Sequence, residues 1–262
     1  MNLKQALSWA TYKLQAKNIN SAKLDAEILL SFVLKKDKTF LYSHPEQTIS
    51  HKPLAIYRKL INQRSENYPV AYLTGEKEFY GYKFFVNKNV LIPRPLTEEL
   101  VEKALQTINR LIKHPNKQIT IADIGTGSGC IIISLANELK KKYGSLKNFK
   151  FYATDISAKA LKVAKKNARF HQVDKSIKFF QGDLLKPLKS KKIDLIIANL
   201  PYLNLKDIQK EKSIQFEPKK ALYSKDNGHL IYQKLFHQAE KSYSNSIIIY
   251  ENKQGIHVRI NY

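Results

Sequence analysis

The 262 residues are 43% hydrophobic and 11% aromatic, enough for a large globular domain with a smaller one, and no apolar run approaches the roughly 18 residues of a membrane span. The amino-terminal stretch "MNLKQALSWATYK" lacks a secretory signal, and the single cysteine, Cys130, excludes an internal disulfide, so we expect a cytoplasmic protein with no membrane association. The net charge of +23 comes from 39 dispersed lysines and only 6 arginines, which favours a lysine-rich solvated surface over a dedicated nucleic-acid site and leaves an acidic or ribosome-associated partner open.

Three helical patterns occupy residues 2 to about 67. The apolar residues recur at helical spacing, after a predicted N-cap at Ser21 for the second helix and with Pro53 near the start of the third. Such stripes indicate a small helical bundle. The stripes are Leu3, Ala6, Leu7, Ala10 and Leu14; Leu24, Ile28, Leu29 and Phe32; and Leu54, Tyr57, Leu60 and Ile61.

Aromatic and β-branched residues then surround Gly81 from Phe79 to Ile92, which predicts a β-hairpin. The next segment, "IPRPLTEELVEKAL", predicts a helix opened by an N-cap at Thr97. We therefore divide the chain into a helical domain at 1–75, a hairpin linker at 76–92 and a larger domain at 93–262.

Strands and helices alternate beyond Gln118. The predicted strands are "ITIADIG", "FKFYATDIS", "IKFFQGDLL", "IDLIIAN" and "SIIIYENK", separated by helical patterns at 130–142, 158–171 and about 228–241. Strict alternation predicts an α/β fold in which a parallel sheet is covered on both faces. Ligands of such sheets bind at the carboxyl ends of the strands, so these ends are the places to look for a site.

The first strand runs into the glycine-rich turn "DIGTGSGC", which contains Gly125, Thr126, Gly127, Ser128 and Gly129. Cys130 replaces the third glycine of the dinucleotide fingerprint, and no Lys-Ser/Thr pair follows to form a phosphate loop. The glycines still let a ligand approach the backbone, and the following helix presents its N-terminal amides to a negative group. A plain tight turn is an equally good interpretation of this motif alone.

The next two strands end in acidic residues. Asp155 can accept hydrogen bonds from both hydroxyls of a ribose, and Asp183, followed by Leu184, can accept from an adenine amino group. Taken singly, each aspartate could be a helix N-cap or a loop residue. Three consecutive strand ends of this kind together predict a site for a nucleoside linked to a charged amino acid.

The fourth strand ends in "NLPY", formed by Asn199, Leu200, Pro201 and Tyr202. This segment resembles the Asn-Pro-Pro-Tyr motif of methyltransferases that act on planar amino or amide nitrogens. The resemblance implies that the Asn199 side-chain oxygen and the carbonyl of Leu200 accept both hydrogens of a planar NH2 group, that Pro201 fixes the chain direction, and that the Tyr202 ring packs on the planar target. A proline-terminated strand in which asparagine caps a turn is the competing interpretation, and the neighbouring strand ends count against it.

These four strand ends resemble those of the S-adenosylmethionine-dependent methyltransferases. In particular, "NLPY" is similar to the Asn-Pro-Pro-Tyr motif of that family. Further segments resemble the glutamine methyltransferases of bacterial peptide chain release factors, in the family's order and over nearly the whole chain. They are "LDAEILLSFVL", "PVAYLTGEKEFYGYKFFVNKNVLIPRPLTEELVE", "FEPKKAL" and "DNGHLIY".

The resemblance implies a Rossmann-like class I methyltransferase sheet, S-adenosyl-L-methionine as cofactor, no metal, and the glutamine of the release factor Gly-Gly-Gln motif as substrate. It also implies that Arg94, Thr97 and Glu217 shape the substrate pocket, and that the amino-terminal bundle helps to dock the factor. Structural hydrogen bonding would explain those three residues equally well. We expect a monomer that modulates translation termination and needs no direct contact with nucleic acid.

Three positions depart from the family pattern. Leu200 replaces a proline and so adds an N–H group, Leu96 replaces a carboxylate in "RPLTE", and Asn252 displaces a glycine in the late element. We also expect the final hairpin to be missing and one sheet edge to be unpaired. Three alternatives therefore stay open. The protein could methylate a glutamine of a ribosomal protein, it could methylate an amino group of a nucleic acid, or it could be a homologue that binds without turnover.

Overall fold

The computed structural model describes residues 1–112 and 117–261. They form two compact units, the first containing Met1–Gly75 with Lys212–Phe216, and the second containing Glu76–Glu211 and the residues from Glu217 onward. Within the described residues, no helix is long and apolar enough to cross a membrane.

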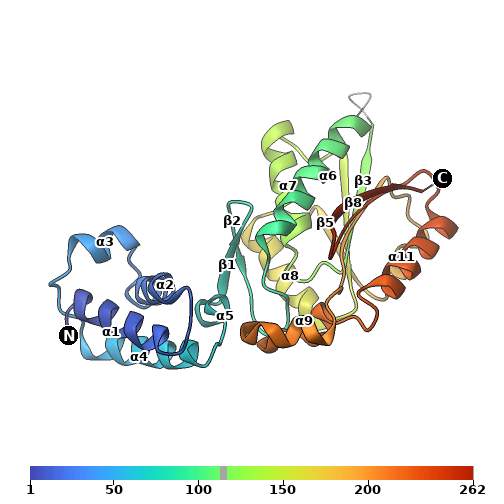
Figure 1. Cartoon of the computed structure of the whole chain (residues 1–262). Coiled ribbons are helices and arrows are strands. Elements are labelled where there is room, and N and C mark those ends of the chain that lie inside the picture. Colours follow the sequence, from blue (N-terminus) through green and yellow to red (C-terminus); the bar gives the residue numbers. More distant parts are fainter. Residues whose placement is uncertain (113–116, 262) are drawn as a thin grey trace. The chain divides into compact units, whose positions relative to one another are not determined.

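The first unit is a helical bundle, as its sequence predicts (Figure 1). Its helices are α1 (Leu3–Gln15), α2 (Ala22–Leu34), α3 (Lys38–Ser43), α4 (His51–Ser65) and α5 (Val70–Thr74), and the short helix η3 (Lys212–Phe216) belongs to the same unit. A capping box between Asn2 and Gln5 starts α1. The buried Tyr57 hydroxyl donates to the Ala26 carbonyl oxygen at 3.0 Å and ties α4 to α2.

Two details of α2 differ from expectation. Leu24 and Phe32 are 47% and 42% exposed, whereas Ala26 and Leu30 are fully buried, so the inner face of this helix combines alanines with the predicted Leu29 and with Leu30. Ser21 precedes α2, but its hydroxyl donates to the Asp25 carboxylate at 2.7 Å instead of accepting from a backbone amide.

The second unit begins with an antiparallel hairpin formed by β1 (Glu76–Phe79) and β2 (Tyr82–Phe85). Tyr80 and Gly81 both have positive φ, which is the backbone of a two-residue turn whose twist matches its strands. Phe79 and Phe84 are buried in the core of this unit. The segment from residue 86 to 92, which we expected to belong to the hairpin, contains no strand.

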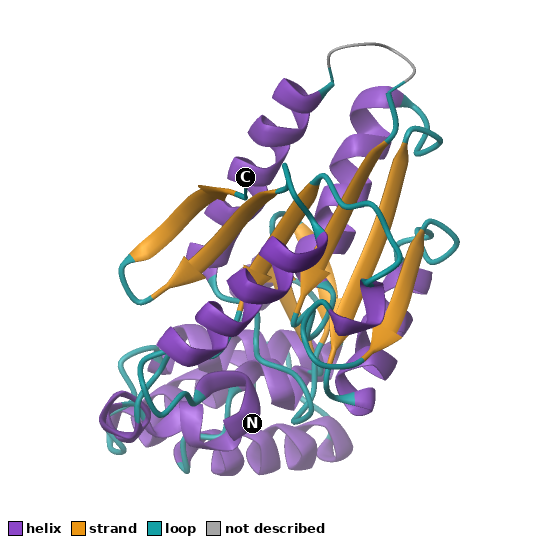
Figure 2. Ribbon diagram, turned by 90° about the vertical axis from the view of Figure 1, so that its right-hand side faces the viewer, coloured by secondary structure: helices purple, strands orange, loops and turns teal. Residues whose placement is uncertain are grey.

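The sheet is mostly parallel, which confirms the predicted fold class (Figure 2). Its strands are β3 (Ile119–Ile124), β4 (Phe149–Asp155), β5 (Ile177–Gln181), β6 (Leu195–Asn199), β7 (Ile247–Asn252) and β8 (Gly255–Ile260), in the order β5-β4-β3-β6-β7-β8. The chain reverses its direction of travel across the sheet at β3, so the crevice beyond β3, β4 and β6 is the expected ligand site.

Helices cover both faces of the sheet (Figure 2), and alternate residues of β3 belong to two different hydrophobic cores. Ile119 and Ile121 join a core with α6 (Glu98–Leu111), α7 (Cys130–Tyr143) and α8 (Ala158–Phe170). Ala122 and Ile124 join a second core with α11 (His229–Ser242) and residues around η2 (Lys186–Leu188). The remaining short elements are η1 (Pro95–Thr97), α9 (Leu205–Lys210) and α10 (Lys219–Leu222).

The expectation of an unpaired edge at β7 is wrong. β8 pairs antiparallel with β7 from Ile247↔Ile260 to Asn252↔Gly255, around a turn at Lys253 and Gln254. The Asn252 side chain accepts the Gln254 N–H at 2.8 Å, and Gly255 has a φ of 120°, so the polar residues after β7 build a turn.

Candidate active site

A cavity of about 350 Å³ lies at the carboxyl ends of β3, β4 and β6. This volume is within the usual range for a small-molecule site. Predicted site residues supply much of its wall: Gly125, Gly127, Asp155, Asp183, Leu184, Asn199, Leu200 and Pro201. The remaining wall comes mainly from Lys88–Leu91 and Pro218–Ala221, which lie in two segments that resemble the family but were not predicted to be site residues.

The glycine-rich turn brings bare backbone to this cavity. Gly125 has a φ of 75°, and a Cβ placed on it would lie 2.8 Å from Cδ2 of Leu200. The N–H groups of Gly125 and Thr126 both donate to the Thr154 carbonyl at 2.9 Å, which anchors the turn to β4. A side chain at position 125 would therefore collide with the Leu200 side chain, in a backbone conformation that favours glycine.

Thr126, Ser128 and Gly129 do not line the cavity. The Thr126 hydroxyl donates to the buried Asp123 carboxylate at 2.6 Å, and a Cβ on Gly129 would lie 2.8 Å from Cδ1 of Ile133. These residues therefore stabilise the conformation of the turn on the side away from the cavity. Burial raises the pKa of Asp123 to about 7.

Asp155 ends β4 and faces the cavity. Its two oxygens accept the backbone N–H groups of Gly127 at 2.9 Å and of Ser157 at 2.8 Å. Burial raises its pKa, and these two hydrogen bonds oppose that shift. Each carboxylate oxygen has a further lone pair, so Asp155 can still accept hydroxyl donors such as those of a ribose.

Asp183 and Leu184 lie beyond β5. The Oδ2 atom of Asp183 pairs with the ammonium groups of Lys234 at 2.8 Å and Lys186 at 2.9 Å, and the hydrogen bond from Lys234 is the main cause of its lowered pKa. Both of these ion pairs involve Oδ2, so Oδ1 is the oxygen that carries no ion pair among the described residues. Leu184 supplies apolar wall in a left-handed conformation, with a φ of 53°.

The orientation of the Asn199 amide is set by two acceptors. Its Nδ2 donates to the Thr97 hydroxyl at 2.9 Å and to Oε2 of Glu251 at 3.0 Å. The Asn199 carbonyl oxygen is therefore the free end of the amide in the described hydrogen-bond network, and Asn199 lines the cavity. Thr97 thus contacts the site through its side chain and does not cap α6 in the predicted way.

Leu200 is buried and its additional N–H group has a partner. It donates to the Tyr232 hydroxyl at 2.9 Å, and this hydroxyl in turn donates to the backbone carbonyl of Glu251. The Tyr202 hydroxyl donates to Oε1 of Glu251 at 2.9 Å, and burial raises the pKa of Tyr202. The NLPY segment is thereby attached to α11 and β7.

Arg94 and Glu217 form an ion pair beside this network. Arg94 donates to Oε1 of Glu217 at 2.5 Å, and the other oxygen of Glu217 accepts the Ile92 N–H at 2.9 Å. Burial raises the pKa of Glu217, whose side chain is only 2% exposed, while the Arg94 charge opposes the shift. The pair joins the segment before η1 to the "FEPKKAL" segment, and neither residue lines the cavity.

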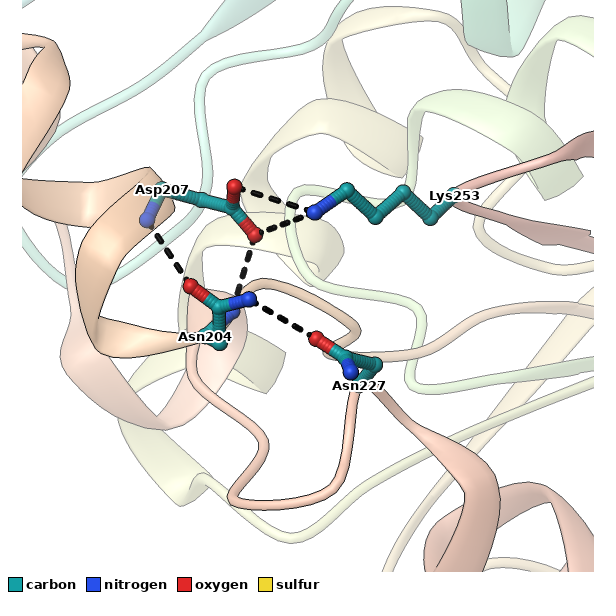
Figure 3. A network of polar contacts seen from close by, with 4 residues as sticks. All are labelled: Asn204, Asp207, Asn227 and Lys253. Carbon is teal, nitrogen blue, oxygen red and sulfur yellow. Dashed lines mark hydrogen bonds and ion pairs between the residues drawn. The ribbon is translucent and has the colours of Figure 1, made fainter.

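The loop after Tyr202 is held by the polar network of Figure 3. Asn204 and Asp207 form a capping box at the start of α9, and Asn204 Nδ2 donates to Asn227 Oδ1 at 2.9 Å. Lys253, in the β7–β8 turn, pairs with the Asp207 carboxylate at 2.8 Å and lowers the pKa of that group. The loop beyond the NLPY motif is thus linked to the last hairpin.

Sequence reasoning missed Glu251 and Tyr232. Glu251 is adjacent to Asn199 in the β6–β7 register, at the carboxyl end of a fifth parallel strand. The rule that identified Asp155 and Asp183 would have found it as well. Tyr232 lies on a helix, and only its hydroxyl contacts reveal its role.

The sequence matches the PrmC N-terminal domain family over residues 5–75 and a methyltransferase domain family over residues 115–252. The release factor glutamine methyltransferase of Dictyoglomus turgidum is 38% identical over 261 residues, covering 98% of this chain and 88% of that protein. The release factor glutamine methyltransferase of Leptospira interrogans is 42% identical over 214 residues, covering 80% of this chain and 71% of that one.

A solved structure also shares the fold. The catalytic domain of hMettl16, in complex with MAT2A 3′UTR hairpin 6, is 16% identical with a TM-score of 0.50, covering 77% of this chain and 68% of that one. At this identity the likeness concerns the fold alone. The relatives that match over most of their length decide the family: this chain belongs to the S-adenosylmethionine-dependent release factor glutamine methyltransferases.

Proposed function

We propose that this protein transfers a methyl group from S-adenosylmethionine to the side-chain amide nitrogen of the glutamine in the Gly-Gly-Gln motif of a peptide chain release factor. The observation that carries the proposal is the fixed amide of the cavity-lining Asn199, whose nitrogen donates to Thr97 and Glu251 while its oxygen has no partner in the described hydrogen-bond network. A planar NH2 group needs such an acceptor. The names of the relatives supply the substrate.

The cavity residues fit the cofactor. Gly125 and Gly127 leave backbone open to a ligand, Asp155 has lone pairs for ribose hydroxyls, and Leu184 provides apolar wall for a base. S-adenosylmethionine, when bound, supplies an electrophilic methyl group on a sulfonium sulfur. Oδ1 of Asp183 is then the acceptor for an exocyclic amino group.

The chain's own contribution to transfer is positioning. An amide nitrogen is a poor nucleophile because its lone pair is delocalised, so its approach angle and desolvation matter. Asn199 Oδ1 accepts one amide hydrogen and the Leu200 carbonyl accepts the other, which orients the nitrogen and holds the proton that it later loses. Tyr202, fixed by Glu251, provides a ring beside the planar group.

The partner is the release factor itself, and the helical residues 1–75 contribute to its docking. The protein acts as a cytoplasmic monomer in this proposal. The match of residues 5–75 to the PrmC N-terminal domain supports a shared role for the bundle across relatives.

Mass spectrometry tests the function. A purified release factor is incubated with the protein and S-adenosylmethionine, and its intact mass and fragments are measured. We expect one added methyl group on the Gly-Gly-Gln glutamine with the wild type, and none with Asn199→Ala, which should retain cofactor affinity. Asn109→Ala, on the exposed face of α6, is the control. Methylation at another residue, or full activity of Asn199→Ala, would contradict the proposal.

A further inference from the structure

Glu251 is a buried carboxylate without a cationic partner among the described residues. Its residue is 1% exposed, and it takes part in none of the ion pairs that the structure describes. Two side chains, Asn199 and Tyr202, donate hydrogen bonds to it instead. Burying a carboxylate charge without a cation destabilises the folded state unless hydrogen bonds compensate for the lost hydration.

An ionised carboxylate can only accept hydrogen bonds, and this determines the direction of every contact around it. Tyr202 must turn its hydroxyl hydrogen toward Glu251. The Thr97 oxygen faces Asn199 as a second acceptor, at 2.9 Å from Nδ2. Asn199 Nδ2 thus has two acceptors on one side, and a flipped amide would place the Asn199 oxygen against the Glu251 carboxylate, which cannot donate.

The flipped amide would also defeat the reaction. It would present an NH2 group to the NH2 group of the target, and two donors cannot form a hydrogen bond. The backbone of the same residue restrains the second acceptor, because the Glu251 carbonyl accepts from Tyr232, whose hydroxyl holds the Leu200 N–H at 2.9 Å. Both acceptors assigned to the target amide thus depend on one residue of β7.

We propose that Glu251 is a positioning residue for methyl transfer: its carboxylate fixes the Asn199 amide with the oxygen toward the target, and its backbone carbonyl restrains Leu200 through Tyr232. This inference rests on the proposed glutamine methylation. It adds a role that lies outside the glycine-rich turn, the two aspartates and the NLPY motif.

Two substitutions remove acceptors in steps. Glu251→Gln keeps one acceptor oxygen, and Glu251→Met keeps the approximate volume without any. We expect the kcat for release factor methylation to fall about 100-fold in the Met variant and less in the Gln variant, because small misplacements of reacting groups cost about this much. The Kd for S-adenosylmethionine should stay within about threefold, since Glu251 does not line the cavity. Glu240→Gln, on the exposed face of α11, is the matched control.

The pH profile separates positioning from packing. Burial raises the pKa of Glu251, and its hydrogen-bond donors lower it. The titratable groups near it are Tyr202, Tyr232 and the like-charged Glu99, so no cation offsets the shift. The wild-type kcat should fall as acid protonates Glu251, and this limb should be absent from Glu251→Gln, which cannot titrate. An identical acid limb in both proteins would count against the inference.

A measurement without substrate completes the test. In ¹⁵N-labelled protein, the side-chain NH2 signals of Asn199, assigned by their absence from Asn199→Ala, should exchange slowly with water and should speed up at least tenfold in Glu251→Met. Unchanged exchange together with unchanged kcat would overturn the role of Glu251. If the wild type methylates no release factor, the proposed function fails, and the exchange comparison still decides the orientation of Asn199.

Discussion

Tyr232→Phe removes one buried hydroxyl that serves two backbone groups. Tyr232 is 5% exposed, and its hydroxyl accepts from the Leu200 N–H and donates to the Glu251 carbonyl. Its ring lies 5.0 Å from the ring of Tyr250, a contact that phenylalanine retains. The substitution therefore isolates the hydroxyl from the packing.

The expected cost follows from the two groups left without a partner. Leu200 and Glu251 are 4% and 1% exposed, so water cannot readily replace the hydroxyl. A buried polar group without a partner costs about 1–3 kcal/mol, and we expect Tyr232→Phe to lower the free energy of unfolding by about 2–4 kcal/mol after some relaxation. Tyr243→Phe is the control, because its buried hydroxyl has no hydrogen-bond partner among the described residues, and it should be neutral or stabilising.

A double-mutant cycle measured by urea unfolding gives the part of this free-energy loss that comes from the Leu200 N–H group. Leu200→Pro deletes the N–H group, so in that background Tyr232→Phe leaves only the Glu251 carbonyl unsatisfied, and its cost should fall by about 1–2 kcal/mol. Additivity within about 0.5 kcal/mol, or equal effects of Tyr232→Phe and Tyr243→Phe, would refute the reasoning.

Three further predictions concern the cavity and its support. Asp155→Ala should weaken S-adenosylmethionine binding by about 10-fold to 100-fold, measured by calorimetry, through loss of charged hydrogen bonds, and an unchanged Kd would remove Asp155 from the site. Gly125→Ala should destabilise the fold more than Gly144→Ala, since both have positive φ but only position 125 meets Leu200; equal urea midpoints would contradict this. The raised pKa of Asp123, about 7, means that its stabilisation is complete below about pH 4 and is lost as pH rises to 7, at about 1.4 kcal/mol per unit. Asp123→Asn should remove that slope from the pH dependence of unfolding, and a persistent slope would assign it to another group.

Alternation of strands and helices was sufficient to predict the parallel sheet and the edge at which Gly125, Asp155, Asp183 and Asn199 lie. Parallel strands put their carboxyl ends together whatever their side chains are, so this part of the site follows from order along the chain. The sequence could not predict which atoms of Asn199 face the cavity. That depends on donors and acceptors from segments more than 50 residues away, including Glu251.

The strand after β7 was missed for a different reason. "GIHVRI" alternates apolar and polar residues in the manner of a strand, and Gly255 with Asn252 marks a turn. The late element departs from the family pattern at Asn252, and this departure suggested that the final hairpin is absent. Within α2, Leu24 and Phe32 were predicted on the buried face but are exposed, and the short side chains of Ala22 and Ala26 are buried instead, together with Leu29. Both errors came from weighting bulk or likeness over local chemistry.

The residues that orient the Asn199 amide lie far apart in the sequence, and this has a consequence for biosynthesis. Thr97, Asn199 and Glu251 are supplied in that order during translation, with the last of them more than 50 residues after Asn199. Until β7 has left the ribosome and paired with β6, the Asn199 amide lacks the acceptor that selects its orientation. A nascent chain could already hold the glycine-rich turn and Asp155, yet without Glu251 we expect it to transfer methyl groups far more slowly. Full activity is therefore expected only from chains that have been synthesised through β7, the last parallel strand.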